Sequence, residues 1–185
     1  MKSIKILTFS LLTTLALFAC GPQIAEDKLA DLGALESKLD TVYQQVESID
    51  SARSMEAVIE FEKNIEIIQY DLKDTFPRET AFFVDEYYRL KKALRNFAKD
   101  YNALAQETAI SKNQLKNLRK DAENGLVEKE QFNDYLELEK ENVNKLYEVS
   151  NSIIPPMQKA LPIFEAKNPK IDSIIQAYQA KQMNE

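Results

Sequence analysis

Residues 83–104 read FVDEYYRLKKALRNFAKDYNAL, and this stretch decides the fold class of the chain. Its apolar and aromatic residues recur at alternating steps of four and three: Phe83, Tyr87, Leu90, Leu94, Phe97, Tyr101 and Leu104. This spacing places them on one face of an α-helix and leaves the charged residues on the opposite face. Because neither Gly nor Pro interrupts the stretch, the sequence predicts one long amphipathic helix over residues 79–109.

The segment before it shows the same alternation, in Leu32, Leu35, Leu39, Val42, Val46 and Ile49. It predicts a helix over residues 24–49, followed by a second over residues 52–74 that Ser51 or Ser54 can cap. Neither Gly nor Pro separates the two, so one continuous helix remains an alternative. The apolar pattern loses register at Arg53 and Glu56, which favours a hairpin.

The stretch TFPRE (75–79) separates these helices from the helix over 79–109. Further on, Ser111-Lys112-Asn113-Gln114 matches a capping box and predicts the start of a shorter helix that ends near Gly125. A long helix over residues 127–153 follows, and we expect the stretch IIPP (153–156) to end it. Four prolines then predict short helices packed at angles, the last starting at Asn168-Pro169 and running to about residue 182.

These elements predict an all-α fold in one domain over residues 27–185. Four long helices joined by short connections favour an elongated, up-down antiparallel bundle with short, proline-punctuated helices at its C-terminus. The chain contains only 3 Gly and 6 Pro in 185 residues, which agrees with a helical rather than a turn-rich β fold. The regular seams also allow oligomerisation, so the sequence leaves the oligomeric state open.

The composition excludes several classes of chemistry. Without His, the chain has no Ser-His-Asp triad and no His-ligated metal, and its single Cys rules out an internal disulfide. Its net charge of −6 argues against a general nucleic-acid-binding protein. No cofactor is indicated.

The first residues have a different character from the rest. Lys2 and Lys5 precede an apolar run over residues 6–19, which is shorter than the roughly 20 residues of a membrane-spanning helix. The run ends in Leu17-Phe18-Ala19-Cys20, which resembles the lipobox of bacterial lipoproteins. The resemblance implies cleavage before Cys20, a diacylglyceryl thioether on its sulfur, and acylation of its new amino group.

The resemblance also implies a location. Residues 1–19 would be a signal peptide, and residues 20–26 would form the lipidated cysteine and a short tether. Six residues after Cys20 span at most roughly 20 Å, so the folded part would lie close to the membrane. We expect a lipid-anchored protein of the cell envelope, with the outer membrane favoured, facing the periplasm or the cell surface.

Charge is unevenly distributed along the chain. Residues 89–120 carry nine basic and two acidic side chains, and Lys112, Lys116 and Arg119 share one helical face with Lys120 beside them. One interpretation is that these residues meet acidic surfaces of the helices 52–74 and 127–153 within the bundle. The other is a patch that binds an acidic partner, anionic lipid or surface glycan, with Lys112, Lys116, Arg119 and Lys120 as its candidate contacts.

Three further groups of residues could in principle bind a ligand or a metal ion: the aromatic residues beside the seam, the stretch around Gly125 and the acidic residues of the helix 127–153. Phe82 and Tyr88 flank the aromatic seam and are candidates to line a cavity for an apolar ligand. A calcium loop around Gly125 is excluded, because it would place Lys120, Ala122 and Gln131 where oxygen ligands are needed. The acidic residues of the helix 127–153, Glu139 among them, lie mostly off the predicted seam and are expected to be solvated.

The sequence therefore favours a non-catalytic function, with no catalytic residue, no metal and no cofactor predicted. A membrane-anchored scaffold, assembly or protein-binding module is the leading interpretation, with a protein partner and no nucleic acid. The alternative is a carrier of a small apolar ligand or lipid, held in a cavity lined by the aromatic helix 79–109.

Overall fold

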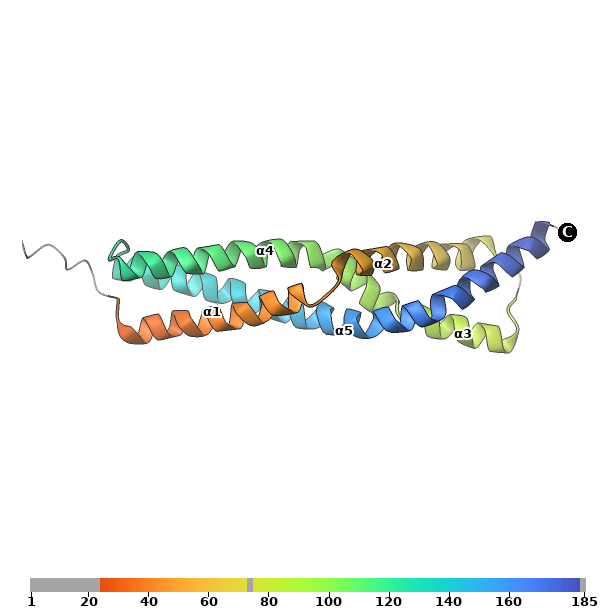
Figure 1. Cartoon of the computed structure of the whole chain (residues 1–185), viewed down its shortest axis with the longest axis horizontal. Coiled ribbons are helices and arrows are strands. Elements are labelled where there is room, and N and C mark those ends of the chain that lie inside the picture. The colour runs from red at the N-terminus through yellow and green to blue at the C-terminus, as the bar shows by residue number, and fades with distance from the viewer. Residues whose placement is uncertain (1–23, 73–74, 184–185) are drawn as a thin grey trace, which may run out of the picture.

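The computed structural model describes residues 24–72 and 75–183, which form a long rod of helices (Figure 1). Its elements are α1 (Glu26–Glu47), α2 (Ser51–Glu66), the π-helical segment η1 (Ile67–Asp71), α3 (Arg78–Tyr88), α4 (Lys91–Glu123) and α5 (Lys129–Met183). The described residues contain no strand, so the all-α prediction is confirmed.

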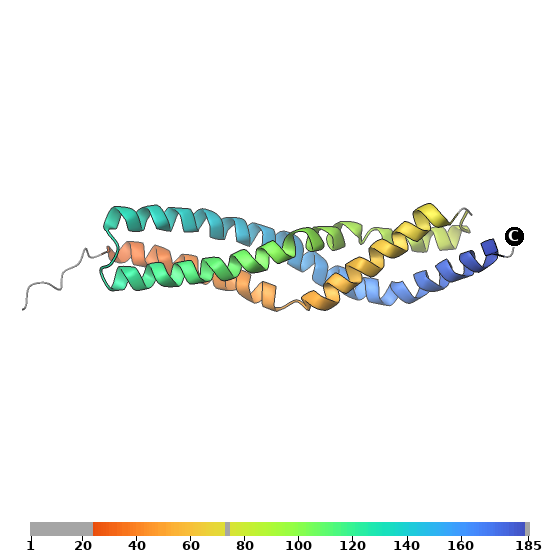
Figure 2. The same cartoon turned by 90° about the horizontal axis from the view of Figure 1, so that it is seen from above.

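The chain runs along the rod three times. α1 and α2 follow one another in the same direction, α3 and α4 return, and α5 spans the whole length (Figures 1 and 2). We call α1, α4 and the first part of α5 the proximal half, and α2, η1, α3 and the last part of α5 the distal half. The 55 residues of α5 give the rod a length of about 80 Å.

The hairpin predicted between the first two helices is wrong. α2 continues in the direction of α1 after a short break, because Asp50 Oδ1 accepts the Arg53 N–H at 2.9 Å and starts a new helix there. Ile49 stays buried across the break. The loss of register at Arg53 marks a change in the helix face that meets the core, and the chain does not reverse. The rod therefore has three helices in cross-section, where four were predicted.

The predicted boundaries around residues 79–125 are also wrong. α3 ends at Tyr88 in a tight turn, and α4 then runs unbroken through Ser111, where a new helix was expected. Thr108 and Ser111 are both buried, and they continue the alternating spacing between Leu104 and Leu115. Thr108 Oγ1 donates to the Leu104 carbonyl at 2.6 Å, which satisfies its hydroxyl inside the helix.

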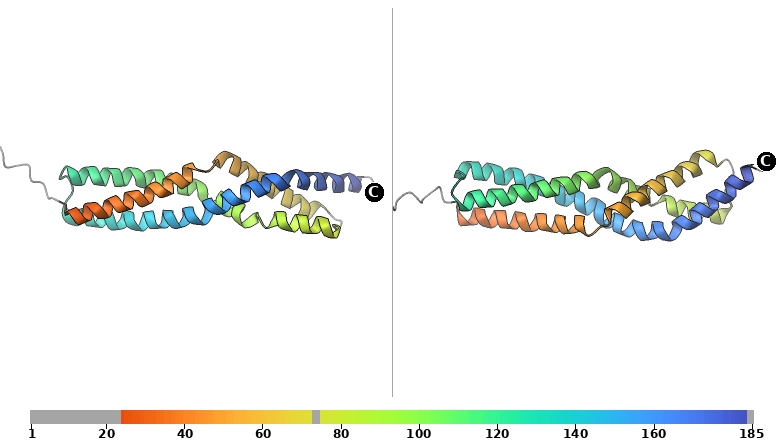
Figure 3. Two further views of the ribbon diagram at one scale, coloured as in Figure 1. Left: turned by 60° about the horizontal axis from the view of Figure 1, so that its bottom comes forward. Right: turned by 45° about the horizontal axis from the view of Figure 1, so that its top comes forward.

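The C-terminal prolines do not break the last helix. α5 contains Pro155, Pro156, Pro162 and Pro169 within one continuous helix, where short helices were predicted. A buried series of apolar residues runs through this region: Ile153, Met157, Ala160, Phe164, Ile171 and Ile175. Their burial outweighs the lost N–H bonds and clashes that prolines impose on a helix interior. The distal part of α5 bends instead of ending (Figure 3).

The prediction for Gly125 is confirmed. It follows α4 with φ of 64°, a conformation that favours glycine. The Leu126 N–H bonds to the Asp121 carbonyl at 2.8 Å and the Gly125 N–H bonds to the Ala122 carbonyl at 3.3 Å. These are the two bonds of a Schellman motif, and they turn the chain from α4 into α5.

The core is continuous along the rod but unequal in its two halves. α4 buries nine residues, whereas α3 buries only Tyr87 and η1 buries none. In the distal half the core centres on three rings, with Phe61 4.9 Å and Phe164 5.9 Å from Tyr87 between centroids. The distal core therefore depends on α2 and α5 more than on α3 and η1.

Candidate functional site

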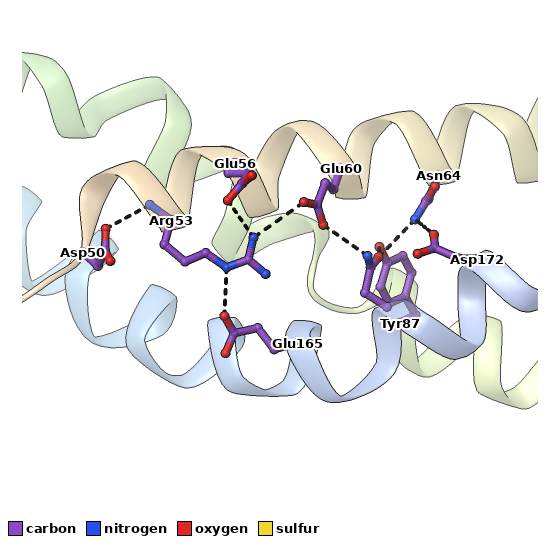
Figure 4. Close-up of polar contacts among 9 residues, drawn as sticks. Asp50, Arg53, Glu56, Glu60, Asn64, Tyr87, Glu165 and Asp172 are labelled. Carbon is purple, nitrogen blue, oxygen red and sulfur yellow. Dashed lines mark hydrogen bonds and ion pairs between the residues drawn. The ribbon is translucent and has the colours of Figure 1, made fainter.

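A network of polar side chains joins α2, α3 and α5 in the distal half (Figure 4). Asn168 Oδ1 accepts two hydrogen bonds, from the Tyr87 hydroxyl at 2.7 Å and from Asn64 Nδ2 at 3.0 Å. Asn64 Nδ2 also donates to Asp172 Oδ1 at 2.9 Å. Tyr87 is fully buried and Asn64 is 6% exposed, whereas Asn168 and Asp172 are half-buried, so these contacts lie at the edge of the core. Burial raises the pKa of the Tyr87 hydroxyl above its usual value, which keeps it protonated as a donor.

The network continues toward the break between α1 and α2 through Arg53. Its guanidinium contacts Glu165 at 2.9 Å, Glu56 at 2.9 Å and Glu60 at 3.5 Å, and these partners raise its pKa above the usual range. Glu60 Oε2 in turn accepts from Asn168 Nδ2 at 3.2 Å. We call this set the polar junction, and it comprises Asp50, Arg53, Glu56, Glu60, Asn64, Tyr87, Glu165, Asn168 and Asp172.

One side of the polar junction opens into a surface groove of about 420 Å³ between α2 and α5. Glu60, Asn64, Asn168 and Asp172 line it, together with the apolar Ile67 and Ile175 and with Lys63, Gln176 and Gln179. Ile67 begins the π-helical segment η1, and short π-helical turns are frequent at functional sites. The groove offers carboxylate and amide groups that can hydrogen-bond a polar surface.

Two further observations concern the described residues as a whole. None of their helices is sufficiently long and apolar to cross a bilayer. No group of three or more acidic, His or Cys side chains in residues 24–72 and 75–183 is placed to hold a metal ion.

The predicted basic residues divide into two groups. Arg119 binds both carboxylate oxygens of Glu36 on α1, with contacts between 2.6 and 3.0 Å, and Glu36 raises the pKa of Arg119. Lys112 pairs with Asp40 of α1 at 3.0 Å and lies over the Tyr43 ring. Both residues therefore contact α1, whereas the sequence pointed to the helices 52–74 and 127–153. Arg95, from the same basic stretch, does meet the first of these, because it pairs with Glu62 of α2 at 3.0 Å.

The other two basic candidates are free of such contacts. Lys116 and Lys120 are exposed, and neither side chain forms an ion pair within the described residues. The four residues therefore do not form one uniform patch. Lys112 and Arg119 hold α4 against α1, and Lys116 and Lys120 remain accessible.

The aromatic candidates also have separate surroundings. Phe82 is 60% exposed, and the Arg78 guanidinium lies 5.5 Å from its ring centroid. Tyr88 is half-buried, and its hydroxyl accepts from Lys91 Nζ at 2.6 Å, which lowers the pKa of the tyrosine. Neither lines the groove at the polar junction or the two further grooves that α5 forms with α1 and α4.

Sequence reasoning missed Glu139, which is buried rather than solvated. It is 8% exposed, its Oε2 meets no hydrogen-bond partner among the described residues, and burial raises the pKa of its carboxyl. Glu139 lies seven residues after Phe132 and seven before Leu146, so the alternating spacing places it in the core.

The same alternating spacing would have placed Asn168 on the core-facing side of α5, whereas from the sequence it was interpreted as a helix cap. It lies four residues after Phe164 and three before Ile171, and it is a partly buried residue within α5. A polar residue that continues an apolar seam is thus the sequence signal for the polar junction.

Cys20, the predicted lipidation site, and the predicted signal peptide lie outside the described residues. Searches against known protein families, curated proteins and solved structures found no match to this chain.

Proposed function

We propose that the protein is a membrane-anchored lipoprotein of the cell envelope that acts as a non-catalytic spacer and scaffold. Lipidation of Cys20 attaches the N-terminal end of the rod to the membrane. The distal half is held away from that membrane and presents the groove at the polar junction to a protein partner.

The direction of the rod is the observation that supports this proposal most. α1 begins at one end, and α5 ends at the other, about 80 Å away (Figure 1). An anchor at residue 20 lies close to the start of α1, so the proximal half would face the bilayer. A long three-helix rod is suited to setting a distance between a membrane and a partner.

The chemistry of the distal half also supports a protein partner. The groove combines carboxylates and amides with Ile67 and Ile175, and interfaces between proteins commonly combine an apolar centre with a polar rim. Tyr70 is 76% exposed and Phe82 60% exposed in the same half. Exposed aromatic side chains are enriched at the contacts that dominate binding.

The carrier alternative has less support. Tyr87, Phe97 and Tyr101 of the aromatic seam are buried in the core, and Phe83 is covered by Lys167 and Lys170, whose amino groups lie 4.5 and 4.4 Å from its centroid. Phe82 is the aromatic candidate that remains open to a ligand. A lipid that copurifies with the chain in native mass spectrometry would favour the carrier over the scaffold.

The scaffold is tested by photo-crosslinking in the native host. A photoreactive residue replaces Gln176 or Gln179 at the distal groove, and Gln114 or Lys116 in matched proximal variants. We expect a stoichiometric partner protein to be captured from the distal positions and not from the proximal ones. Capture from the proximal positions alone would contradict the proposal.

The anchor has its own test. Cys20→Ala is expected to move the protein from the membrane fraction to the soluble fraction, as judged by fractionation and immunoblotting. A Cys20→Ala protein that stays in the membrane fraction would show that the anchor is wrong.

A further inference from the structure

The proximal half carries a second open groove, of about 390 Å³, between α4 and α5. Leu104 and Leu146 are buried at its base, and Val149 is half-buried along its wall. Charged residues stand on its two sides, with Asp100 and Glu107 on α4 and Lys145 on α5, and Asp100 lies 3.9 Å from its neighbour Lys99. An apolar slot between two antiparallel helices of a three-helix bundle leaves room for further helices to pack.

Glu107 and Lys145 are unpaired and lie at the same height along the rod. Neither Glu107 nor Lys145 forms an ion pair with another residue that the structure describes. Glu107 lies 16 residues before the last residue of α4, and Lys145 lies 16 residues after the first residue of α5. Because both helices rise by the same amount per residue from one turn, the acid and the base face each other across the groove.

This arrangement is complementary to itself. A two-fold axis parallel to the rod places α4 of one copy over α5 of the other at unchanged height. Glu107 of each copy then meets Lys145 of the other, so the ion pair forms twice. The exposed Ala103 meets Val149 in the same way, because each lies 20 residues from its end of the turn.

We propose that this groove is the interface of a parallel, side-by-side dimer of the chain. The parallel direction rests on the proposed function, because lipid anchors in one membrane give every copy the same orientation. Confinement to a surface also raises the effective concentration of the second copy. A dimer of this kind buries both grooves and leaves the distal grooves between α2 and α5 open for the partner.

Other two-fold arrangements are distinguishable. An axis across the rod places α4 over α4 and α5 over α5, so Glu107 meets Glu107 and Lys145 meets Lys145, and the two N-terminal ends point in opposite directions. In that antiparallel arrangement Asp100 lies opposite Gln114 of the other copy, whereas Ala103 and Val149 are displaced by about eight residues, or roughly 12 Å. In the parallel arrangement Asp100 and Gln114 are about 14 residues, or roughly 21 Å, out of register.

The test uses the full chain in the membrane of its own host. Two tagged copies are coexpressed, one with Ala103→Cys and the other with Val149→Cys, and treated with a short bismaleimide. We expect a crosslinked band that carries both tags. The pair Asp100→Cys and Gln114→Cys, which the antiparallel arrangement would bring together, is expected to give none, and a chain with Cys20 as its only cysteine serves as the background control. A strong band from the second pair alone, or no band from either, would overturn the proposal.

Charge reversal tests the recognition directly. Glu107→Lys and Lys145→Glu are each expected to lower the crosslinked fraction about tenfold, because the pair occurs twice and attraction becomes repulsion. The two substitutions in one chain should restore it. Lys116→Glu makes the same charge change away from the groove and is expected to leave the fraction unchanged. Two single variants without effect would overturn the proposal.

Fractionation of the same samples separates this inference from the proposed function. If the chain stays in the membrane fraction but does not crosslink, the result contradicts the dimer and agrees with the anchor. If the chain crosslinks but is recovered in the soluble fraction, the result contradicts the anchor and agrees with the dimer.

Discussion

Glu139 shows how a single residue can oppose the packing of this bundle. Its carboxyl occupies a core position of α5, and Oε2 has no hydrogen-bond partner among the described residues. Burial favours the neutral form, so the pKa of Glu139 is raised in the folded protein. Below the pKa of the unfolded chain the carboxyl is protonated in both states. As the pH rises above that value, the folded state is progressively destabilised relative to the unfolded one.

We therefore predict that Glu139→Gln increases the free energy of unfolding at pH 7 by about 1–2 kcal/mol. The gain should shrink as the pH falls toward about 4, below which the wild-type carboxyl is neutral in both states. Urea unfolding followed by circular dichroism between pH 4 and 8 measures it. Glu137→Gln, at an exposed position of the same helix, is the matched control, and an equal gain there would contradict the role of burial.

Tyr87 is the residue on which the polar junction and the distal aromatic core meet. Its ring packs between Phe61 and Phe164, and its hydroxyl donates to Asn168. Phenylalanine keeps the ring contacts and removes only the donor. The effect of that change therefore isolates the hydrogen bond.

We predict that Tyr87→Phe lowers the free energy of unfolding by about 1–2 kcal/mol, because a buried acceptor loses one of its donors. Chemical denaturation of the purified protein measures the change. Tyr70→Phe, at a 76% exposed position, should change it by less than about 0.5 kcal/mol. Equal effects at the two positions would show that the junction hydrogen bond contributes no stability.

At the scale of elements, α5 is the part that organises the rod. It contacts α1, α2, α3 and α4, and it spans both halves. Its four prolines each remove a backbone donor from the helix, yet Met157, Ala160 and Phe164 between them stay buried. α5 is therefore maintained by its tertiary contacts against an unfavourable local sequence.

We predict that Pro156→Ala increases the free energy of unfolding by about 1–3 kcal/mol, because it restores an N–H and removes a clash in the helix interior. Pro156 is exposed, so the change leaves the core intact. Thermal unfolding followed at far-ultraviolet wavelengths measures it. Pro77→Ala, at the cap of α3, is expected to give no gain, and a loss of stability in Pro156→Ala would contradict an unbroken α5.

At the scale of the whole molecule, charge pairs select which helices are neighbours. In the proximal half Arg119 and Lys112 of α4 contact Glu36 and Asp40 of α1, and in the distal half Arg53 of α2 contacts Glu165 of α5. These pairs are partly exposed, so each contributes little free energy alone. Their contribution is mainly to specify which surfaces pack together.

We predict that Arg119→Glu lowers the free energy of unfolding by about 1 kcal/mol through repulsion with Glu36, and that adding Glu36→Arg restores most of it. Lys116→Glu, at a free position of α4, should have no comparable effect. Urea unfolding of the four proteins completes the comparison. If Glu36→Arg fails to rescue Arg119→Glu, the pair does not couple α1 to α4.

The sequence predicted the contacts of the candidate site only in part. The sequence predicted that the basic residues of α4 meet acidic surfaces within the bundle. Arg95 does pair with Glu62 of α2, whereas Lys112 and Arg119 pair with α1. The polar junction was not predicted, because Asn64, Tyr87 and Asn168 are far apart in the sequence and meet only when α2, α3 and α5 pack together. Residue spacing alone could only have shown that Asn168 and Glu139 continue apolar seams.

The amino-acid sequence by itself determined that the described chain is helical, that the apolar seams of α1 and α4 face the core, and that Gly125 turns α4 into α5. These features depend on side-chain periodicity and on local backbone conformation, which neighbouring residues set. Only the tertiary structure decided that α2 extends α1, that α4 continues through Ser111 and that α5 passes four prolines. At each of these points a local signal to stop or turn competes with apolar burial against helices distant in sequence, and the burial contributes more free energy than the local signal does.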